Sequence, residues 1–233
     1  MSIKENGFLS SEITNWITVH RKRERDWYQL AFDLNALSHK FLVQFPVFND
    51  EGRFQTISRA LFVKTLTNFQ AAIVLALHGL TGDALNSLRS AFESVFFLGA
   101  CKEDEELVDQ LIVADTHFKK KMARGVLGLE ADVDLSADRK QQLETFLAEN
   151  PEKTEEINVF HVAEKAGLAD IYRVYYRSLS HDALHTSISS LDRYLEHSSD
   201  GKLVGVRYGP DVDDVEHILA SACVVGFLML RLV

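Results

Sequence analysis

Cysteine and proline are scarce in this chain, which has two cysteines and three prolines among its 233 residues. Cys101 and Cys223 lie far apart in apolar sequence, and no Cys-x-x-Cys pair occurs. Two such thiols supply neither a disulfide framework nor a zinc site, so we expect both to be buried and reduced in a cytoplasmic protein. Because proline interrupts helices, its scarcity also leaves long stretches in which a helix can continue.

Basic residues are in deficit, since 25 Lys and Arg oppose 34 Asp and Glu and give a net charge of −9. A general nucleic-acid binder needs a basic surface to neutralise phosphates, so this balance does not favour RNA as a partner. A local basic patch could still contact RNA, and His20 to Arg25 is such a run. Its simplest interpretation is the solvent-exposed face of a helix.

Several sequence signatures are missing. The chain has no glycine-rich phosphate loop and no Gly-x-Ser-x-Gly motif, which argues against ATP-dependent chemistry and serine hydrolysis. The first residues, MSIKENGFLSSE, contain no apolar run typical of a secretion signal. The most apolar stretch, 218–233, contains Arg231 and is shorter than the roughly 20 residues that cross a bilayer. We therefore predict a cytoplasmic protein with no membrane partner.

The apolar pattern predicts an all-α fold. Hydrophobic residues make up 46% of the chain, and their long three- and four-residue periodicities predict an antiparallel bundle of about seven to eight helices. We expect one helical domain over 1–233, with an exposed loop at the polar stretch 148–156. Residues 202–208 are predicted to form a short strand or β-hairpin arm. The expected helices cover about 10–45, 54–78, 81–102, 103–124, 136–150, 158–166 and 218–233, and the stretch 168–185 is a further candidate.

The most informative stretch is 69–98, where two apolar helical runs meet at a glycine-containing turn. We expect Thr81 or Asp83 to cap the second helix. Within that helix Arg89 and Glu93 lie one turn apart, in a phenylalanine-rich sequence that indicates burial on almost all sides. A buried charge must be paired and hydrogen-bonded, so we predict that this pair faces other polar groups as a structural salt bridge.

A second polar segment lies at 172–187. If it is helical, Arg177, His181 and His185 follow one another at four-residue steps along one stripe. Histidine can exchange protons near neutral pH, so these are candidate catalytic residues. Alternatively, the histidines bond to backbone carbonyls at a helix end. The candidate binding residues are Arg89, Glu93, Tyr176 and Ser180.

Together the two segments resemble a large family of bacterial helical proteins catalogued as a domain of unknown function. The resemblance rests on an Arg-Ser-x-x-Glu helix at 89–93 and a later Tyr-Arg-x-x-Ser segment at 176–180, followed by His185-Thr186-Ser187. It extends from about Ala60 to Ser187. It implies an all-α bundle in which the Arg89/Glu93 pair meets the later segment across the core, and it implies no activity.

Three functions from different classes fit these residues. In the first, the polar cluster of an uncharacterised soluble bundle is structural or lines a ligand pocket, which the absence of any catalytic motif favours. This cluster consists of Arg89, Glu93, Tyr176, His181 and His185. The second is a metal-independent ribonuclease that resembles the HEPN class of toxins and phage-defence effectors. There a histidine transfers protons and an arginine stabilises the anion, although the class spaces the two differently from Arg177 and His181 or His185.

The third is a helical metal-binding protein. His181 and His185 have the spacing of a ligand pair, and Glu93 with Asp115 or His117 could complete a shell. The Glu-x-x-His motifs of di-iron bundles do not occur at core positions, so we predict no metal and no cofactor. We also expect a homodimer, because cyclic dimers are the commonest soluble oligomers and the first and last helices offer apolar faces.

Overall fold

The computed structural model describes residues 2–44, 52–128, 135–150, 157–183 and 188–232. It is 80% helical, with 11 continuous helical segments in these ranges, ten of at least seven residues, and one two-stranded antiparallel sheet. The all-helical expectation therefore holds apart from one hairpin, while the predicted count of helices was too low. The elements are α1 (Ile3–Asn6), η1 (Gly7–Leu9), α2 (Ile13–Arg23), α3 (Arg25–Gln44), α4 (Arg53–Leu77), α5 (Thr81–Glu103), α6 (Glu106–Gly128), α7 (Ala137–Glu149), α8 (Val159–Lys165), α9 (Ala169–Ile171), η2 (Tyr172–Tyr176), α10 (Arg177–Ala183), α11 (Ile188–Asp192), β1 (Leu195–His197), β2 (Leu203–Val206) and α12 (Val215–Leu232).

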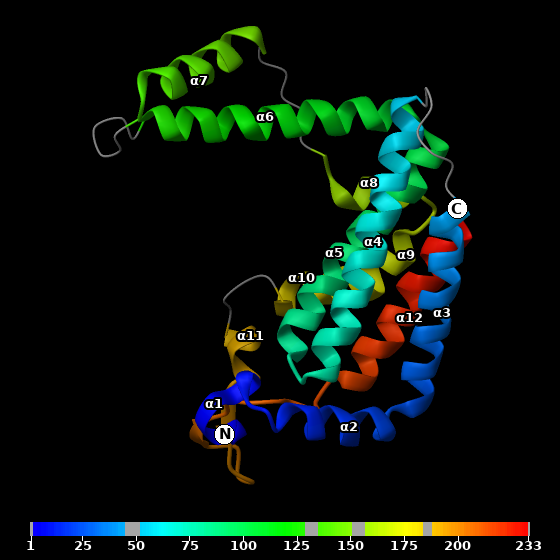
Figure 1. Cartoon of the computed structure of the whole chain (residues 1–233), viewed down its shortest axis with the longest axis vertical. Coiled ribbons are helices and arrows are strands. Elements are labelled where there is room, and N and C mark those ends of the chain that lie inside the picture. The colour runs from blue at the N-terminus through cyan, green and yellow to red at the C-terminus, as the bar shows by residue number, and fades with distance from the viewer. Residues whose placement is uncertain (1, 45–51, 129–134, 151–156, 184–187, 233) are drawn as a thin grey trace.

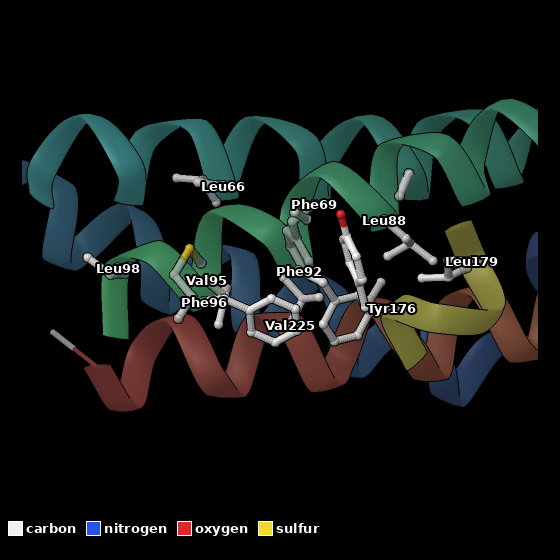
Figure 2. Packing of buried hydrophobic residues seen from close by; sticks show 14 of the residues in the cluster. Leu66, Phe69, Leu88, Phe92, Val95, Phe96, Leu98, Tyr176, Leu179 and Val225 are labelled. Carbon is white, nitrogen blue, oxygen red and sulfur yellow. The ribbon is translucent and has the colours of Figure 1, made fainter. Parts of the chain in front are cut away.

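The core lies where α3, α4, α5 and α12 run side by side (Figure 1). Every residue of α5 from Ser94 to Cys101 is buried, so this helix is enclosed on all sides over two turns. On α12, Gly226 leaves room for close approach, because an added Cβ would lie 3.2 Å from Leu34 and 3.3 Å from Phe69. Figure 2 shows Phe92, Phe96 and Val225 packed in one cluster.

The helical hairpin predicted at 69–98 is confirmed as α4 and α5. Gly79 forms its turn with φ of +74°, and a Cβ there would lie 2.7 Å from the backbone nitrogen of Asp211. The predicted cap is wrong, because Leu80 is the N-cap and makes no side-chain cap hydrogen bond. Instead, Asp211 approaches the turn: its N–H donates to the Gly79 carbonyl at 3.0 Å, and its carboxylate accepts from Thr81 at 3.5 Å.

The single helix predicted over 10–45 is interrupted. Glu24, with φ of −102° and ψ of 34°, separates α2 from α3. Figure 1 shows α2 across one end of the bundle and α3 along its side. The physical reason is that α3 buries Tyr28, Ala31 and Leu34 in the core, whereas α2 has no buried residue and folds over the end. The predicted stop at Pro46 lies outside the described residues.

The helices α6 and α7 form an arm that extends away from the bundle in Figure 1. The helix predicted to end near Arg124 continues to Gly128, so Lys119 to Lys121 do not occupy its last turn. Lys119 instead pairs with Asp115 at 2.6 Å. The start of α7 is as predicted, since Ser136 Oγ accepts from the N–H of Arg139 at 3.4 Å. Residues 151–156 of the expected 148–156 loop lie outside the described ranges.

The strand predicted at 202–208 is confirmed as β2. The position of its antiparallel partner β1 was not predicted, although a short hairpin was expected here, and the register places Leu195 opposite Val206 and His197 opposite Leu203. Both strands are mostly exposed, which leaves little apolar alternation to reveal β1 in the sequence.

Two helices in the described ranges, α4 and α12, are long and apolar enough to cross a membrane by length and composition alone. The core helices of soluble bundles have the same composition, so this is weak evidence. Both helices pack against α5 and against each other. The absence of a membrane partner and the cytoplasmic location stay predictions.

Candidate functional site

The strongest polar cluster joins α5 to the segment formed by α9, η2 and α10. Arg89 and Glu93 lie one turn apart on α5, and Tyr176 is the last residue of the π-helical turn η2. In that turn the N–H of Arg177 donates to the carbonyl of Tyr172, five residues back. Single π turns are rare in proteins and are frequent at functional sites.

Arg89 is the centre of this cluster, which we call the Arg89 network: Arg89, Glu93, Tyr176 and Ser180. Its Nε donates to Ser180 Oγ at 3.1 Å, and its Nη2 donates to the Tyr176 hydroxyl at 2.7 Å. Its Nη1 lies 3.5 Å from Glu93 Oε2. The guanidinium carbon also lies 4.9 Å from the centroid of the Tyr176 ring, within the range of a cation–π contact. Every guanidinium nitrogen therefore has a partner within the protein.

Tyr176 links the two charges. Its hydroxyl donates to Glu93 Oε2 at 2.8 Å while accepting from Arg89. Burial raises the pKa of Tyr176 well above its ordinary value, and the negative charge of Glu93 and the hydrogen bond to it raise it further, against smaller lowering effects of Arg89 and Ser180. The phenol therefore stays protonated at neutral pH and is a hydrogen-bond donor there, not a base.

Ser180 completes the network. Its hydroxyl donates to the Tyr176 carbonyl at 2.8 Å and accepts from Arg89. The carbonyl of Tyr176 lies where the π turn passes into α10, so this bond supports the backbone at the change of helix type. The hydroxyl thereby connects the backbone of this segment to α5.

The network lies at the edge of the core rather than deep inside it. Tyr176 is 4% exposed, but the side chains of Arg89 and Glu93 are 21% and 31% exposed. The prediction that the charged pair is buried on almost all sides was therefore wrong in degree. Aromatic rings close the inner side, because Phe96 meets Tyr176 edge-on with centroids 5.6 Å apart (Figure 2). Tyr172 packs against the same ring at 5.0 Å.

The structure brings together all four predicted binding residues, from positions up to 91 residues apart in sequence. The predicted catalytic residues are described less completely. Arg177 is exposed at the start of α10. His181 lies on α10 but its side chain is not among those described, and His185 lies outside the described residues.

The donor groups named for a metal do not gather where the structure describes them. Among described side chains, no three His, Cys, Asp or Glu lie close enough to hold a metal ion. Glu93 is engaged by Arg89 and Tyr176, and Asp115 is engaged by Lys119 on α6.

A second polar cluster, beside the α4–α5 turn, was not predicted. Arg207 donates to Asp213 at 2.9 Å, lies 3.6 Å from Asp211, and donates to the carbonyl of Arg193 at 3.0 Å. Of these residues, Arg193, Arg207 and Asp211 border a cavity of about 230 Å³ that Thr81 also lines. From the sequence, the acidic run 211–216 was interpreted only as the start of the last helix. The four-residue step from Arg207 to Asp211 was the signal in the sequence that could have indicated this ion pair.

A family model matches residues 55–203 of the chain and is described as a family of unknown function, DUF5677. The chain belongs to DUF5677. The expected resemblance to a domain of unknown function is thus confirmed, while the particular motifs assigned to it stay predictions. The DUF5677 match contains the whole Arg89 network, and α2, α3 and α12 lie outside it. No curated protein and no solved structure matches the chain.

Proposed function

We propose that this DUF5677 protein is a non-catalytic helical-bundle protein in which the Arg89 network is a structural clasp. The observation that carries the proposal is that each of the three guanidinium nitrogens of Arg89 contacts a partner, namely Ser180, Tyr176 and Glu93. A ligand anion would therefore compete with a protein partner at every guanidinium nitrogen. The network is also neutral in sum, because the arginine and glutamate charges cancel and Tyr176 is protonated.

The clasp joins parts of the chain that are distant in sequence. Its hydrogen bonds from α5 to Tyr176 and Ser180 span 83 to 91 residues. Buried polar groups of this kind are satisfied only in one relative placement of the two elements, since any shift leaves a charge or hydroxyl unpaired. The network therefore selects one register of the π turn and α10 against α5.

The test is induced expression of the wild-type protein in bacteria beside His185→Ala, with growth and total RNA recorded for both. A structural clasp in a non-catalytic protein gives normal growth and intact RNA in both cultures. Growth arrest with RNA cleavage that His185→Ala abolishes would overturn the proposal and put the ribonuclease first.

The second candidate is that metal-independent ribonuclease, acting as a toxin or phage-defence effector of HEPN type. The observation that favours it is that α10 spans Arg177 to Ala183, so Arg177 and His181 lie one turn apart on a helix that begins at a π turn. Arg177 is exposed and accessible to a phosphate. In this function Arg177 would stabilise the anion while His181 and His185 would transfer protons.

This candidate is tested with purified protein, a single-stranded RNA and a chelator that removes divalent metals. If it is correct, Arg177→Ala and His181→Ala each reduce cleavage about 10²–10⁴-fold, the usual effect of losing one such catalytic group. Arg173→Ala is the matched control, because Arg173 is an exposed arginine on the preceding turn that pairs with Asp170 at 2.9 Å. Equal activity in all four proteins would exclude these residues as catalysts.

A homodimer is the expected assembly in either case. The supporting observation is that large apolar side chains are exposed on helices of the bundle and of the arm, among them Val74, Phe118 and Phe227 at 51%, 61% and 55%. Light scattering at micromolar concentration tests this, and a monomeric mass would contradict it.

A further inference from the structure

The elbow between α2 and α3 contains a cavity that neither the family match nor the Arg89 network includes. Its volume is about 370 Å³, within the range of small-ligand sites. Arg21 and Lys22 from α2 and Arg25 from α3 line it together. Three cations around one cavity, in a chain of net charge −9, make a site for an anion.

Tyr28 supplies an independent indication of a ligand. It lines the same cavity and is 1% exposed, yet its hydroxyl has no hydrogen-bond partner among the described residues. Nearly all buried polar groups in proteins are paired, so an orphan of this kind indicates a missing partner. Burial raises the pKa of Tyr28 to about 12, with Glu24 adding to the rise and Arg21 opposing it. The hydroxyl is therefore a neutral donor at physiological pH.

One of the cations, Arg21, is held in place by an aromatic contact. The guanidinium carbon of Arg21 lies 4.8 Å from the centroid of the Phe32 ring, so the aromatic face fixes the arginine while its N–H edge stays available. Glu24, the carboxylate whose charge adds to the raised pKa of Tyr28, is paired at 3.2 Å with Arg23, a cation that does not line the cavity.

We propose that this elbow, defined by Arg21, Lys22, Arg25 and Tyr28, binds a phosphate or pyrophosphate group. Two guanidinium groups and one ammonium group line the cavity beside the phenol, and because these three cations are donors only, they match a multiply charged oxyanion. The planar forks of Arg21 and Arg25 suit phosphate oxygens in particular. The group can belong to a small phosphorylated molecule or to an RNA backbone, and both present the same oxygens.

The experiment is a titration of the full chain with inorganic pyrophosphate, followed by tryptophan fluorescence. Both tryptophans of the chain, Trp16 and Trp27, lie on the two helices of the elbow, so the signal reports on this site. We expect saturable binding that weakens with added salt. Arg21→Gln and Arg25→Gln should each weaken it about tenfold or more, as loss of a charge-assisted hydrogen bond does.

Two further variants separate specific binding from general attraction. Arg23→Gln removes the same charge from the same basic run, but Arg23 does not line the cavity, so its affinity for pyrophosphate should stay close to that of the wild type. Tyr28→Phe should weaken binding about fivefold through loss of one hydrogen bond. It should not lower the unfolding temperature of the ligand-free protein, because the hydroxyl it removes has no partner there.

A short unstructured RNA identifies the source of the phosphate. RNA binding that pyrophosphate displaces and Arg25→Gln weakens assigns the site to a nucleic-acid backbone. Binding of pyrophosphate without binding of RNA assigns it to a small phosphorylated ligand. The proposal is overturned if neither probe saturates the fluorescence change at millimolar concentration, or if Arg23→Gln weakens binding as much as Arg25→Gln does.

Discussion

The hydroxyl of Tyr176 donates a hydrogen bond of 2.8 Å to Glu93 Oε2, and these residues are 83 positions apart in the chain. The same hydroxyl accepts from Arg89 at 2.7 Å, so one neutral group lies between two opposite charges. Because the phenol is part of the π turn, the bond joins the backbone geometry of η2 to one face of α5. The π turn and the contacts of Tyr176 with α5 therefore depend on each other.

Replacement of Tyr176 by Phe should lower the free energy of unfolding by about 1–3 kcal/mol, because Glu93 and Arg89 each lose a partner in a mostly buried place. Urea denaturation followed by circular dichroism measures the change. Tyr172→Phe is the control, since Tyr172 packs in the same ring cluster and its hydroxyl makes no hydrogen bond that the structure describes. Equal effects of both changes would mean that the hydroxyl of Tyr176 contributes nothing specific.

Stability should decrease in alkaline solution, and Tyr28 should contribute to this. Its pKa rises from an ordinary value of 10 to about 12 in the folded protein, so the folded form keeps a proton that the unfolded form has lost. The stabilisation is complete below pH 10 and disappears as pH rises towards 12, at about 1.4 kcal/mol per pH unit for one proton. Urea denaturation at a series of pH values should give Tyr28→Phe a correspondingly shallower decline. Parallel curves for both proteins would contradict the assignment.

Both cysteines should resist thiol reagents in the native protein. Cys101 and Cys223 are 0% and 2% exposed, and burial raises the pKa of each thiol from 9 to about 11. Because the thiolate is the reactive form, the burial of each sulfur and its raised pKa both slow the reaction at neutral pH. A chromogenic disulfide reagent should therefore react slowly with native protein and release two equivalents once denaturant is added. Rapid reaction of either thiol without denaturant would show that its part of the core opens easily.

Gly79→Ala should destabilise the protein by about 1–3 kcal/mol through backbone strain alone, since φ is +74° at this turn. The added Cβ would also lie 2.7 Å from the Asp211 nitrogen and 2.7 Å from the Trp16 ring, which increases the cost. Thermal denaturation measures it.

Gly125→Ala is the matched control on α6. A Cβ there would meet no atom within 4 Å, so alanine should stabilise the helix by about 0.5–1 kcal/mol. If both variants lost stability equally, the turn at Gly79 would have no special requirement for glycine.

Local patterns were enough to predict α4, α5, α7 and α8, because the apolar stripe or capping residue that indicates each helix lies within the helix or next to it in the sequence. It failed at Glu24, where nothing in the sequence breaks the helix and the chain turns so that α2 can cover the end of the bundle. It also failed to predict β1, whose residues are exposed on a two-stranded hairpin and carry no alternating pattern.

The sequence by itself determined that Arg89 and Glu93, one turn apart in an apolar helix, need polar partners, since a desolvated charge without one is too costly. It also predicted Tyr176 and Ser180 as candidates, although spacing within a helix cannot say which distant side chains meet. Only the tertiary structure placed the Tyr176 hydroxyl between the two charges, because that contact depends on how the π turn packs against α5. The same holds for the elbow, where three cations and an unpartnered phenol share a cavity only because α2 and α3 meet at an angle.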